Sequence, residues 1–453
     1  MTHRRDRRQS IELRTRAVAA RRLGRYNTGP IMQLPSSAFD WVLPVPTSLS
    51  ELSQKMSLFS AVEMAPRDPI LGLNEAFNAD TRSTKVNLGV GVYFTEEGRI
   101  PLLRAVAEAE RARIEAHAPR GYLPIEGIAA YDSAVQKLLL GADSALLAEG
   151  RVVTTQAVGG TGALKTGADF LKRLLPDAVV AISDPSWENH RALFESAGFP
   201  VQNYRYYDAA SNGVNRSGML EDLKALPPRS IVVLHACCHN PTGVDLTLDD
   251  WKAVLEVLRE REHVPFLDIA YQGFGEGIEQ DAFAVRLFAE SGLQFLVSSS
   301  FSKSFSLYGE RVGALSIVTS SKEEAGRVLS QVKRVIRTNY SNPPTHGATV
   351  VASVLGSSEL RALWEEELGE MRQRIHSMRL AMVEQLAALG AKRDFSFVAR
   401  QRGMFSYSGL TAEQVDRLRN EFGIYAVSTG RICVAALNHN NLPAVTQGIA
   451  QVL

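Results

Sequence analysis

The sequence predicts an α/β protein that combines a large domain, built on a mostly parallel sheet flanked by helices, with a smaller α+β domain. Between about residues 150 and 320, short β-rich runs are apolar along their length, which is typical of strands buried on both faces. Helix-like segments separate several of these runs, as expected where helices cover both faces of a parallel sheet. From about residue 358 the chain is richer in long amphipathic helix, which indicates the smaller domain.

The elements can be assigned in chain order. The expected strands are RVVTTQ (151–156), AVVAISD (178–184), SIVVLHA (230–236), VPFLDIA (264–270), QFLVSSS (294–300) and VGALSIV (312–318). The helices expected between them include GALKTGADFLKRLL (162–175) and LDDWKAVLEVLRERE (248–262). The smaller domain should contain one long helix over 359–389, followed by RGMFSYSG and GRICVAAL. Ligands of such folds gather at the carboxyl ends of the strands, so unusual residues there are candidates for a site.

The composition is that of an ordinary globular protein. The chain has 453 residues, enough for two or three domains, with 45% hydrophobic residues, 22% charged residues and a formal net charge of +1. It has no apolar stretch of about 20 residues, so no transmembrane helix is expected. Its three cysteines, two of them adjacent, do not suggest a disulfide framework. We therefore expect no membrane or nucleic-acid partner and a cytoplasmic setting.

The first 56 residues differ from the rest. Residues 1–25 carry nine arginines, and prolines follow at positions 30, 35, 44 and 46. We expect a disordered tail, or a native start as late as Met56. An Arg-rich targeting peptide and a short DNA-binding arm are the alternatives.

The motif VGGTGALKTG, residues 158–167, places two glycines and a threonine at the start of a predicted helix. Free backbone N–H groups and the helix dipole make such a start an anion site, to which Thr161 adds a hydroxyl. The motif is no dinucleotide fingerprint, because Lys165 stands at the third glycine position, and it lacks the Gly-Lys-Ser/Thr triplet of a P-loop. A simple glycine turn is the alternative.

Two further strand ends carry unusual residues. Asp268 ends an apolar strand in FLDIAYQGF, where a carboxylate is costly unless a cation or donor meets it. It could form a structural ion pair, or hold a positively charged ring nitrogen of a ligand that Tyr271 also reaches. Trp187 in DPSWENH could stack on a flat ring, although most tryptophans are core or interface residues.

HACCHNPTG, residues 235–243, looks at first like a zinc cluster. On a strand its two histidines and Cys237 would share one face while Cys238 points the other way. The spaced ligand pairs of zinc sites are missing, so no metal is expected. Asn240 would project from a strand end, where its amide could serve a ligand or hold the turn.

SSSFSKSFSLYGERVG, residues 298–313, sets Lys303 among six serines just after a predicted strand. It could be a solvated loop, a phosphate cradle or a lysine kept for covalent chemistry. Arg337 and Arg431 each stand in a largely uncharged segment, and arginine is well shaped to take a carboxylate through two parallel hydrogen bonds. Taken together, these residues are what pyridoxal phosphate acting on amino acids would need.

Six motifs together resemble those of a known family. HACCHNPTG, DIAYQGF, SSSFSKSFSLYGERVG, NYSNPP, GMFSYSGL and STGR look like the class I aminotransferases of the aspartate and aromatic branch, closest to the bacterial aromatic-amino-acid (tyrosine) aminotransferases. The resemblance runs from about Ser57 to Leu453. It implies a cytoplasmic, fold-type-I homodimer with active sites at the subunit interface, working in amino acid biosynthesis.

The resemblance also implies the reaction and the residues that perform it. Tyrosine, phenylalanine and also aspartate would be transaminated with 2-oxoglutarate or glutamate, through a Schiff base of pyridoxal 5'-phosphate and a ping-pong mechanism. The catalytic residues would be Lys303, which forms the Schiff base and moves the proton, Asp268, which partners the pyridine nitrogen, and Tyr271, which with Asn240 bonds the phenolic oxygen.

The remaining roles follow in the same way. The ring would stack on Trp187, and the phosphate would be held by Gly160, Thr161, Ser300, Ser302, Arg311 and Tyr122. The substrate would contact Gly91, Trp187, Asn240, Arg431, which takes the α-carboxylate, and Arg337, which takes a side-chain carboxylate. Tyr122 and Arg337 would reach the site from the other subunit.

The resemblance divides the chain into domains. Residues 57–67 would be an arm to the partner subunit and 101–370 the large cofactor domain. Residues 68–100 and 371–453 would form the small domain, which closes over substrate and excludes water.

The expected specificity is broad and includes aromatic residues. Phe94 and Ile100 correspond to apolar positions of the aromatic branch, whereas Val92, Thr161 and Asn342 look more like the aspartate branch. An aspartate aminotransferase with little aromatic activity is the alternative.

The sequence disfavours two other classes of protein. A nicotinamide dehydrogenase is disfavoured by the broken glycine fingerprint. A transcriptional regulator with a pyridoxal-phosphate domain is disfavoured because the N-terminal tail looks too short for a winged helix and a linker.

Overall fold

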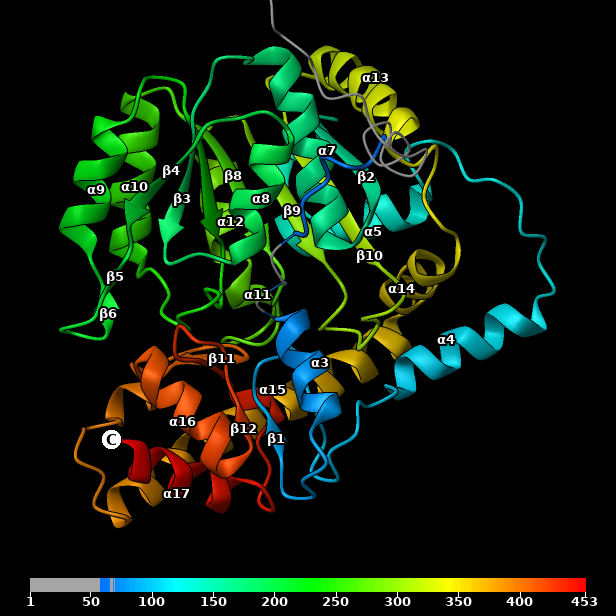
Figure 1. Cartoon of the computed structure of the whole chain (residues 1–453). Helices are drawn as coiled ribbons and strands as arrows, with labels where there is room; N and C mark the ends of the chain where they lie inside the picture. The colour runs from blue at the N-terminus through cyan, green and yellow to red at the C-terminus, as the bar shows by residue number, and fades with distance from the viewer. Residues whose placement is uncertain (1–57, 66–67, 69) are drawn as a thin grey trace, which may run out of the picture. The chain divides into compact units, whose positions relative to one another are not determined.

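The computed structural model describes residues 58–65, 68 and 70–453, in two compact units that divide between residues 66 and 67. Of the first unit, only residues 58–65 are described, as a turn and irregular chain. The predicted tail, residues 1–56, lies outside the described residues, and the arm to a partner subunit stays a prediction. The second unit carries the fold (Figure 1).

A seven-stranded sheet forms the centre of this unit. Its strand order is β2, β10, β9, β8, β7, β3, β4. Strands from β9 to β4 pair in parallel, and β10 pairs antiparallel with both β9 and β2. The predicted α/β class with a mostly parallel sheet is therefore confirmed. The strands are β2 (Val152–Val158), β3 (Val180–Asp184), β4 (Val201–Arg205), β7 (Ile231–His235), β8 (Val264–Ile269), β9 (Phe295–Ser300) and β10 (Val312–Val318).

Helices cover both faces of the sheet because its strands are apolar on both. On one face α7 (Gly159–Leu174) packs on β2, β9 and β10. On the other face α5 (Ala129–Leu140) packs on β2 and β10. Successive residues of β10 belong to different hydrophobic clusters, Ala314 to the cluster of α5 and Leu315 to that of α7. This alternation is the period-two pattern of a strand buried on both sides.

The other helices extend these layers. α13 (Lys322–Asn339) packs on α7, and α8 (Glu188–Ser196) packs on α7, β3 and β4. Thr247 and Asp250 form a capping box at the start of α10, which fixes where that helix begins. The remaining helices of this part are α4 (Arg104–Glu115), α6 (Ala145–Ala148), α9 (Arg216–Ala225), α10 (Leu248–Glu260), α11 (Ile278–Asp281), α12 (Phe283–Glu290) and α14 (His346–Gly356), with the short strands β5 (Tyr207–Asp208) and β6 (Gly213–Val214).

The C-terminal region packs together with the segment that begins at α3 (Leu71–Ala79). Strand β1 (Val86–Asn87) pairs in parallel with β12 (Ile424–Tyr425), so segments far apart in sequence lie side by side (Figure 1). The long helix α15 (Ser358–Ala388) is continuous across the predicted domain boundary at 370/371, and the division into domains stays a prediction. The other elements are η1 (Ser396–Arg400), β11 (Phe405–Tyr407), α16 (Ala412–Phe422), β13 (Arg431–Cys433), η2 (Val434–Ala436) and α17 (Leu442–Val452).

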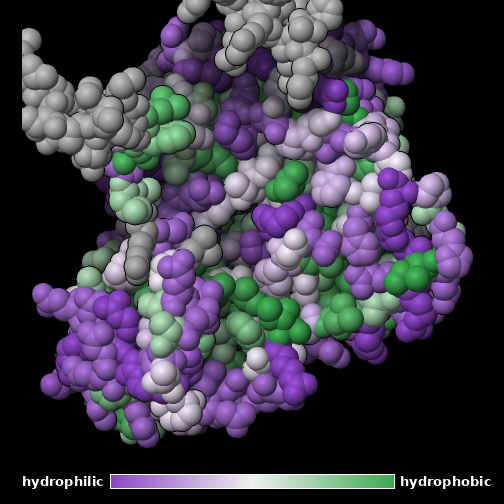
Figure 2. Space-filling view, turned by 45° about the vertical axis from the view of Figure 1, so that its right-hand side comes forward, coloured by the Kyte–Doolittle hydropathy of each residue, from purple (hydrophilic) through white to green (hydrophobic). Residues whose placement is uncertain are grey.

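The surface of the described chain is mixed. Figure 2 shows hydrophilic residues over much of one face, with hydrophobic residues in separate patches. In the part of the chain that the structure describes, no helix combines the length and the apolarity that crossing a bilayer requires.

Candidate active site

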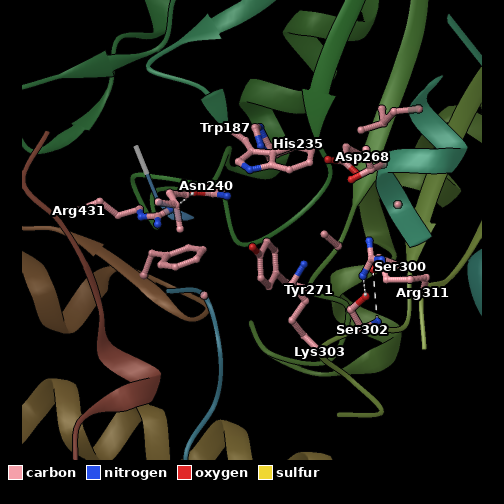
Figure 3. A pocket seen from close by; sticks show the side chains of 17 residues that line it. Trp187, His235, Asn240, Asp268, Tyr271, Ser300, Ser302, Lys303, Arg311 and Arg431 are labelled. Atoms are coloured by element: carbon pink, nitrogen blue, oxygen red, sulfur yellow. Dashed lines mark hydrogen bonds between the residues drawn. The ribbon is translucent and has the colours of Figure 1, made fainter. Parts of the chain in front are cut away.

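A cavity of about 200 Å³ lies where β7, β8 and β9 end and α7 begins (Figure 3). Figure 3 shows Arg431 and Asn240 on one side of it and the serine and arginine cluster on the other. Twelve of the fourteen predicted site residues line it, which brings together positions more than 300 residues apart in sequence: Gly91, Gly160, Thr161, Trp187, Asn240, Asp268, Tyr271, Ser300, Ser302, Lys303, Arg311 and Arg431.

The start of α7 forms an anion cradle. The helix begins at Gly159, three residues earlier than predicted, and no side chain of the described residues caps it. The N–H of Gly159 donates to the carbonyl of Arg311 at 2.9 Å, and the next two residues, Gly160 and Thr161, line the cavity. Gly159 has a φ of +69°, and a Cβ there would lie 2.4 Å from Nη2 of Arg311. Only glycine fits so close an approach. A Cβ at Gly160 would lie 3.2 Å from the Cβ of Ser300, so this side of the cradle is tightly bounded too.

Arg311 is fixed by the loop that carries the lysine. Its Nη1 donates to the hydroxyl of Ser302 at 3.2 Å and to the carbonyl of Tyr308 at 3.0 Å. Among the described residues, no carboxylate pairs with its guanidinium. A cation beside free helix N–H groups and serine hydroxyls is the chemistry that binds a phosphate.

Asp268 is a buried carboxylate held by a histidine. It is 5% exposed and accepts a hydrogen bond from Nε2 of His190 at 3.1 Å, while Nδ1 of His190 pairs with Ser186 at 3.0 Å. Burial alone would raise the pKa of Asp268, but the bond from His190 and the charge of Lys303 hold that pKa below its ordinary value. The carboxylate therefore stays ionised, as binding a protonated ring nitrogen requires.

Lys303 is a lysine with a depressed pKa. Burial lowers its pKa to about 8, although the negative charge of Asp268 acts in the opposite direction. Its Nζ lies 4.9 Å from the ring centroid of Tyr271. Burial also raises the pKa of Tyr271, whose hydroxyl therefore stays protonated and able to donate. A lysine that is partly neutral near pH 7 can act as a nucleophile and as a base.

Arg431 is a buried cation without a counter-ion. It is 2% exposed and donates to Oδ1 of Asn240 at 3.1 Å and to the carbonyl of Gly89 at 2.6 Å. Its guanidinium lies 4.3 Å from the ring centroid of Phe405, and its Nε has no hydrogen-bond partner. No carboxylate of the described residues pairs with it. Such a charge is stabilised when an anion arrives, and the group best matched in shape is a carboxylate.

Two of the predicted site residues are not in the cavity. Tyr122 lies between α4 and α5 with 97% of its surface exposed. Arg337, in the last turn of α13, is exposed and donates to the hydroxyl of Ser341. The predicted specificity positions Phe94 and Ile100 do not line the cavity either, and Ile100 is 50% exposed.

Sequence reasoning missed several residues of the site. His190 stands three residues after Trp187 in a motif already singled out, and this helical spacing was an available signal. His235 had been considered only as a metal ligand. The apolar lining residues gave no signal, because they resemble ordinary core positions in sequence: Ile70, Leu164, Ala270 and Phe405.

The predicted strand geometry through HACCH is wrong. Strand β7 ends at His235, and Cys238 has a φ of +51°, so the chain has already left the strand where alternating faces were expected. The ring of His239 instead stacks on Tyr206 with centroids 4.0 Å apart and hydrogen bonds to Ser183 and Thr242.

Two groups of potential metal ligands occur among the described residues. In the first, ligand atoms of His190, His235 and Asp268 lie within 4.8 Å of one another, but both ring nitrogens of His190 are in hydrogen bonds. The second comprises Cys237, Cys238 and Asp281, whose carboxylate accepts three backbone N–H bonds. Among the described residues, Nε2 of His235 has no hydrogen-bond partner, but neither group has all of its donors free for an ion.

Comparison with known proteins gives close relatives of both specificities. The chain is 84% identical over 398 residues to an aspartate aminotransferase of Pseudomonas aeruginosa, covering 88% of this chain and all of the relative. It is 55% identical over 397 residues to an aromatic-amino-acid aminotransferase of Escherichia coli, covering 87% of this chain and all of that one.

A solved structure and a family model agree with these relatives. An aromatic-amino-acid aminotransferase of Burkholderia pseudomallei, covalently bound to pyridoxal phosphate, matches with a TM-score of 0.86 and 74% identity over 88% of this chain and all of that one. Residues 83–449 match the family model described as aminotransferase class I and II. The family resemblance found in the motifs is therefore confirmed, and the chain belongs to the class I and II aminotransferases.

Proposed function

We propose that this aminotransferase exchanges amino groups between aromatic amino acids or aspartate and 2-oxoglutarate, with pyridoxal phosphate as its cofactor. The observation that carries the proposal is that Lys303 and Arg431 line one cavity. A partly neutral lysine suits attack on an aldehyde, and a buried guanidinium without a counter-ion suits the carboxylate common to all amino acids. The covalent pyridoxal phosphate of the similar Burkholderia pseudomallei enzyme supports the choice of cofactor.

The residues of the cavity fit this cofactor. The start of α7, with Ser300, Ser302 and Arg311, would hold the phosphate, and the residues reaching the ring would be Asp268, Trp187, Tyr271 and Asn240. When bound, the cofactor withdraws electrons from the α-carbon of the substrate.

The residues of the chain then have separate tasks. Asp268 stays ionised and keeps the ring nitrogen protonated. Arg431 binds the α-carboxylate and so orients the Cα–H bond. The freed amine of Lys303 would move the proton from the α-carbon to the cofactor in the first half of the exchange, and from the cofactor to the α-carbon of the new amino acid in the second half. Tyr271, whose hydroxyl stays protonated, would donate a hydrogen bond to the phenolic oxygen of the cofactor.

The breadth of the specificity rests on the apolar part of the wall. Ile70 and Phe405 line the cavity near Arg431 and offer an aromatic side chain an apolar surface. Relatives named for aromatic amino acids at 74% and 55% identity support this breadth. The 84% identical relative named for aspartate favours the second candidate, an aspartate aminotransferase with little aromatic activity.

A substrate panel decides between these two candidates. We expect kcat/KM values for tyrosine, phenylalanine and aspartate, with 2-oxoglutarate as acceptor, to lie within about 100-fold of one another. A preference for aspartate beyond about 100-fold corresponds to about 2.7 kcal/mol of transition-state discrimination and would establish the second candidate. If no amino acid is turned over by protein supplied with the cofactor, the whole proposal fails.

We further propose a cytoplasmic homodimer, active in amino acid biosynthesis, in which each subunit completes the other's site. Tyr122 and Arg337 lie outside the cavity of their own chain, and exposed apolar side chains surround α4, which supports a partner surface there: Ile100, Leu102 and Ile114. In this assembly a small domain of residues 68–100 and 371–453 closes over substrate. The three buried free cysteines are compatible with a reducing compartment.

Subunit mixing tests the shared site. Lys303→Ala and Arg337→Ala proteins should each be inactive or weak on aspartate. A hybrid dimer has one site with both residues intact, so mixing after mild dissociation should restore activity toward wild type. Mixtures that gain no activity, although hybrids form, contradict a shared site.

A further inference from the structure

A second cavity, apart from the active site, has four arginines among its thirteen lining residues. It measures about 510 Å³ and lies between the loop after β8, the middle of α15 and the chain that joins η1 to β11. None of its lining residues lines the active-site cavity, so transamination gives it no role. Its charged and titratable lining residues are Glu276, Arg372, His376, Arg379, Arg400 and Arg402.

Four arginines face a single carboxylate in this cavity. Nη2 of Arg402 pairs with Oε1 of Glu276 at 2.9 Å. Arg372 donates to the carbonyl of Gly273 at 2.7 Å and, among the described residues, to no carboxylate. Glu276 is already paired, and among the described residues neither Arg372 nor Arg400 forms an ion pair with a carboxylate. The buried carboxylate of Asp245 acts on the charges of Arg379 and Arg402.

Arg400 has the fewest interactions of the four arginines. Within the described residues its exposed side chain forms neither a hydrogen bond nor an ion pair. Its charge lowers the pKa of Asp394, but that carboxylate is hydrogen-bonded to Ser396 in the first place. The guanidinium of Arg400 is therefore available to a ligand.

Arg379 adds a positive charge to the floor of the cavity. It is 1% exposed and donates to the carbonyls of Val398, Gly403 and Phe405. Burial lowers its pKa to about 10, so it is still protonated at neutral pH. Carbonyl dipoles only partly offset a buried charge, so Arg379 adds to the attraction of the cavity for an anion.

We propose that this cavity is a binding site for a small anion of the phosphate class, held between Arg372 and Arg400 above Arg379. Guanidinium groups match phosphate oxygens through paired N–H bonds, and several arginines in one cavity favour a multivalent ion. The volume accommodates an ion as large as pyrophosphate.

The backbone connects this site to the active site. The N–H of Arg402 donates to the carbonyl of Gly243 at 2.7 Å, three residues after Asn240. Nη2 of Arg379 holds the carbonyl of Phe405 at 2.6 Å, and the ring of Phe405 lies against Arg431. An anion in the cavity therefore stabilises the segment that supports the carboxylate-binding arginine.

Calorimetric titration of the holoenzyme with pyrophosphate tests the proposal. We expect saturable binding that Arg400→Gln weakens by at least 10-fold, and a rise in melting temperature with pyrophosphate that this variant loses. Because Arg400 has no hydrogen-bond partner among the described residues, the variant should fold, and its own melting curve and its activity on aspartate verify this.

Two matched variants locate the anion. Arg327, an exposed arginine on α13, should be replaceable by glutamine without effect on binding. Arg337→Gln should also leave it unchanged. If Arg327→Gln weakened pyrophosphate binding as much as Arg400→Gln, the binding would reflect the general charge of the protein. If only Arg337→Gln lost pyrophosphate binding, the anion would belong to the substrate site. Either result, or the absence of saturable binding to the wild-type holoenzyme, overturns the proposal.

Discussion

The two sides of the active-site cavity differ in how completely one chain builds them. The cofactor side has its lysine, its carboxylate and its phosphate cradle at the ends of buried strands and the start of α7. The substrate side has Arg431 in place, whereas Arg337 lies at the surface. Tyr122, the expected phosphate contact from the partner subunit, is the one predicted cofactor-side residue that also lies at the surface. The core of one chain thus fixes the residues of the chemical step. Assembly of the dimer is needed to position Arg337, which is proposed to select the side chain, and Tyr122, which is proposed to contact the phosphate.

The largest expected effect is on the cofactor side. Lys303→Ala removes both the nucleophile and the base, so kcat should fall by about 10⁶-fold. Steady-state transamination of aspartate measures it. Lys322→Ala, which changes an exposed lysine at the start of α13, should behave as wild type. If Lys303→Ala keeps a tenth of the wild-type activity, the assignment of Lys303 is wrong.

The second largest effect is expected from the carboxylate of Asp268. Asp268→Asn keeps the size of the side chain but loses the charge that stabilises a protonated ring nitrogen, so kcat should fall by about 10³-fold. The exposed Asp249→Asn is the matched control, and single-turnover rates separate chemistry from product release. A loss below 10-fold would mean that the His190–Asp268 pair is only structural.

A smaller and more selective effect is expected on the substrate side. Arg337→Ala should lower kcat/KM for aspartate about 100-fold, because a charged side chain loses its partner. The first half-reaction with phenylalanine should change less than about threefold, since it needs no such partner. Rapid-mixing measurement of each half-reaction makes the comparison. Equal losses for aspartate and phenylalanine contradict the assigned role.

The cofactor side should also show a characteristic pH dependence of cofactor capture. Burial lowers the pKa of Lys303 to about 8, so in cofactor-free protein the rate of cofactor capture should rise with pH and level off above about 8. Asp268→Asn should shift this midpoint downward, because the carboxylate raises the pKa of the lysine. Stopped-flow absorbance follows the capture, and a midpoint near 10.5 in wild type contradicts a buried lysine.

The same shift has a consequence for stability. The folded-state pKa of Lys303 lies below its unfolded value, so the unfolded chain binds more protons between about pH 8 and 10.5. The contribution of Lys303 to the unfolding free energy of cofactor-free protein therefore rises with pH across that window. Lys303→Met should flatten this part of the profile.

The sequence predicts the cofactor side better than the substrate side, for physical reasons. Lys303, Asp268 and Gly160 interrupt apolar strands or open a helix, and such interruptions are visible without a structure. The place of Phe405 in the cavity could not be predicted, because an apolar residue in a strand has the same sequence pattern whether it lies in the core or faces a cavity. His190 required knowing that α8 turns toward the end of β8, which depends on tertiary packing and not on local pattern.

The smallest expected effect lies where the two sides join. The hydroxyl of Tyr308 accepts a hydrogen bond at 2.9 Å from the backbone N–H of Tyr93, which lies two residues after Gly91 in the sequence. The backbone carbonyl of Tyr308 accepts a second hydrogen bond, from Arg311 at 3.0 Å. Tyr308→Phe breaks only the first bond and leaves a partly buried donor unsatisfied, a cost of about 1–3 kcal/mol.

Because that donor belongs to the substrate side, Tyr308→Phe should raise KM for the amino acid by about 3- to 10-fold while kcat changes less. Tyr207→Phe is the matched control, since within the described part of the chain its hydroxyl bonds only to Asn212, outside the cavity. Cofactor affinity, measured by fluorescence, should stay within about twofold of wild type because the Arg311 contact is to the backbone. If cofactor affinity falls while KM holds, Tyr308 supports the phosphate cradle and does not couple the two sides.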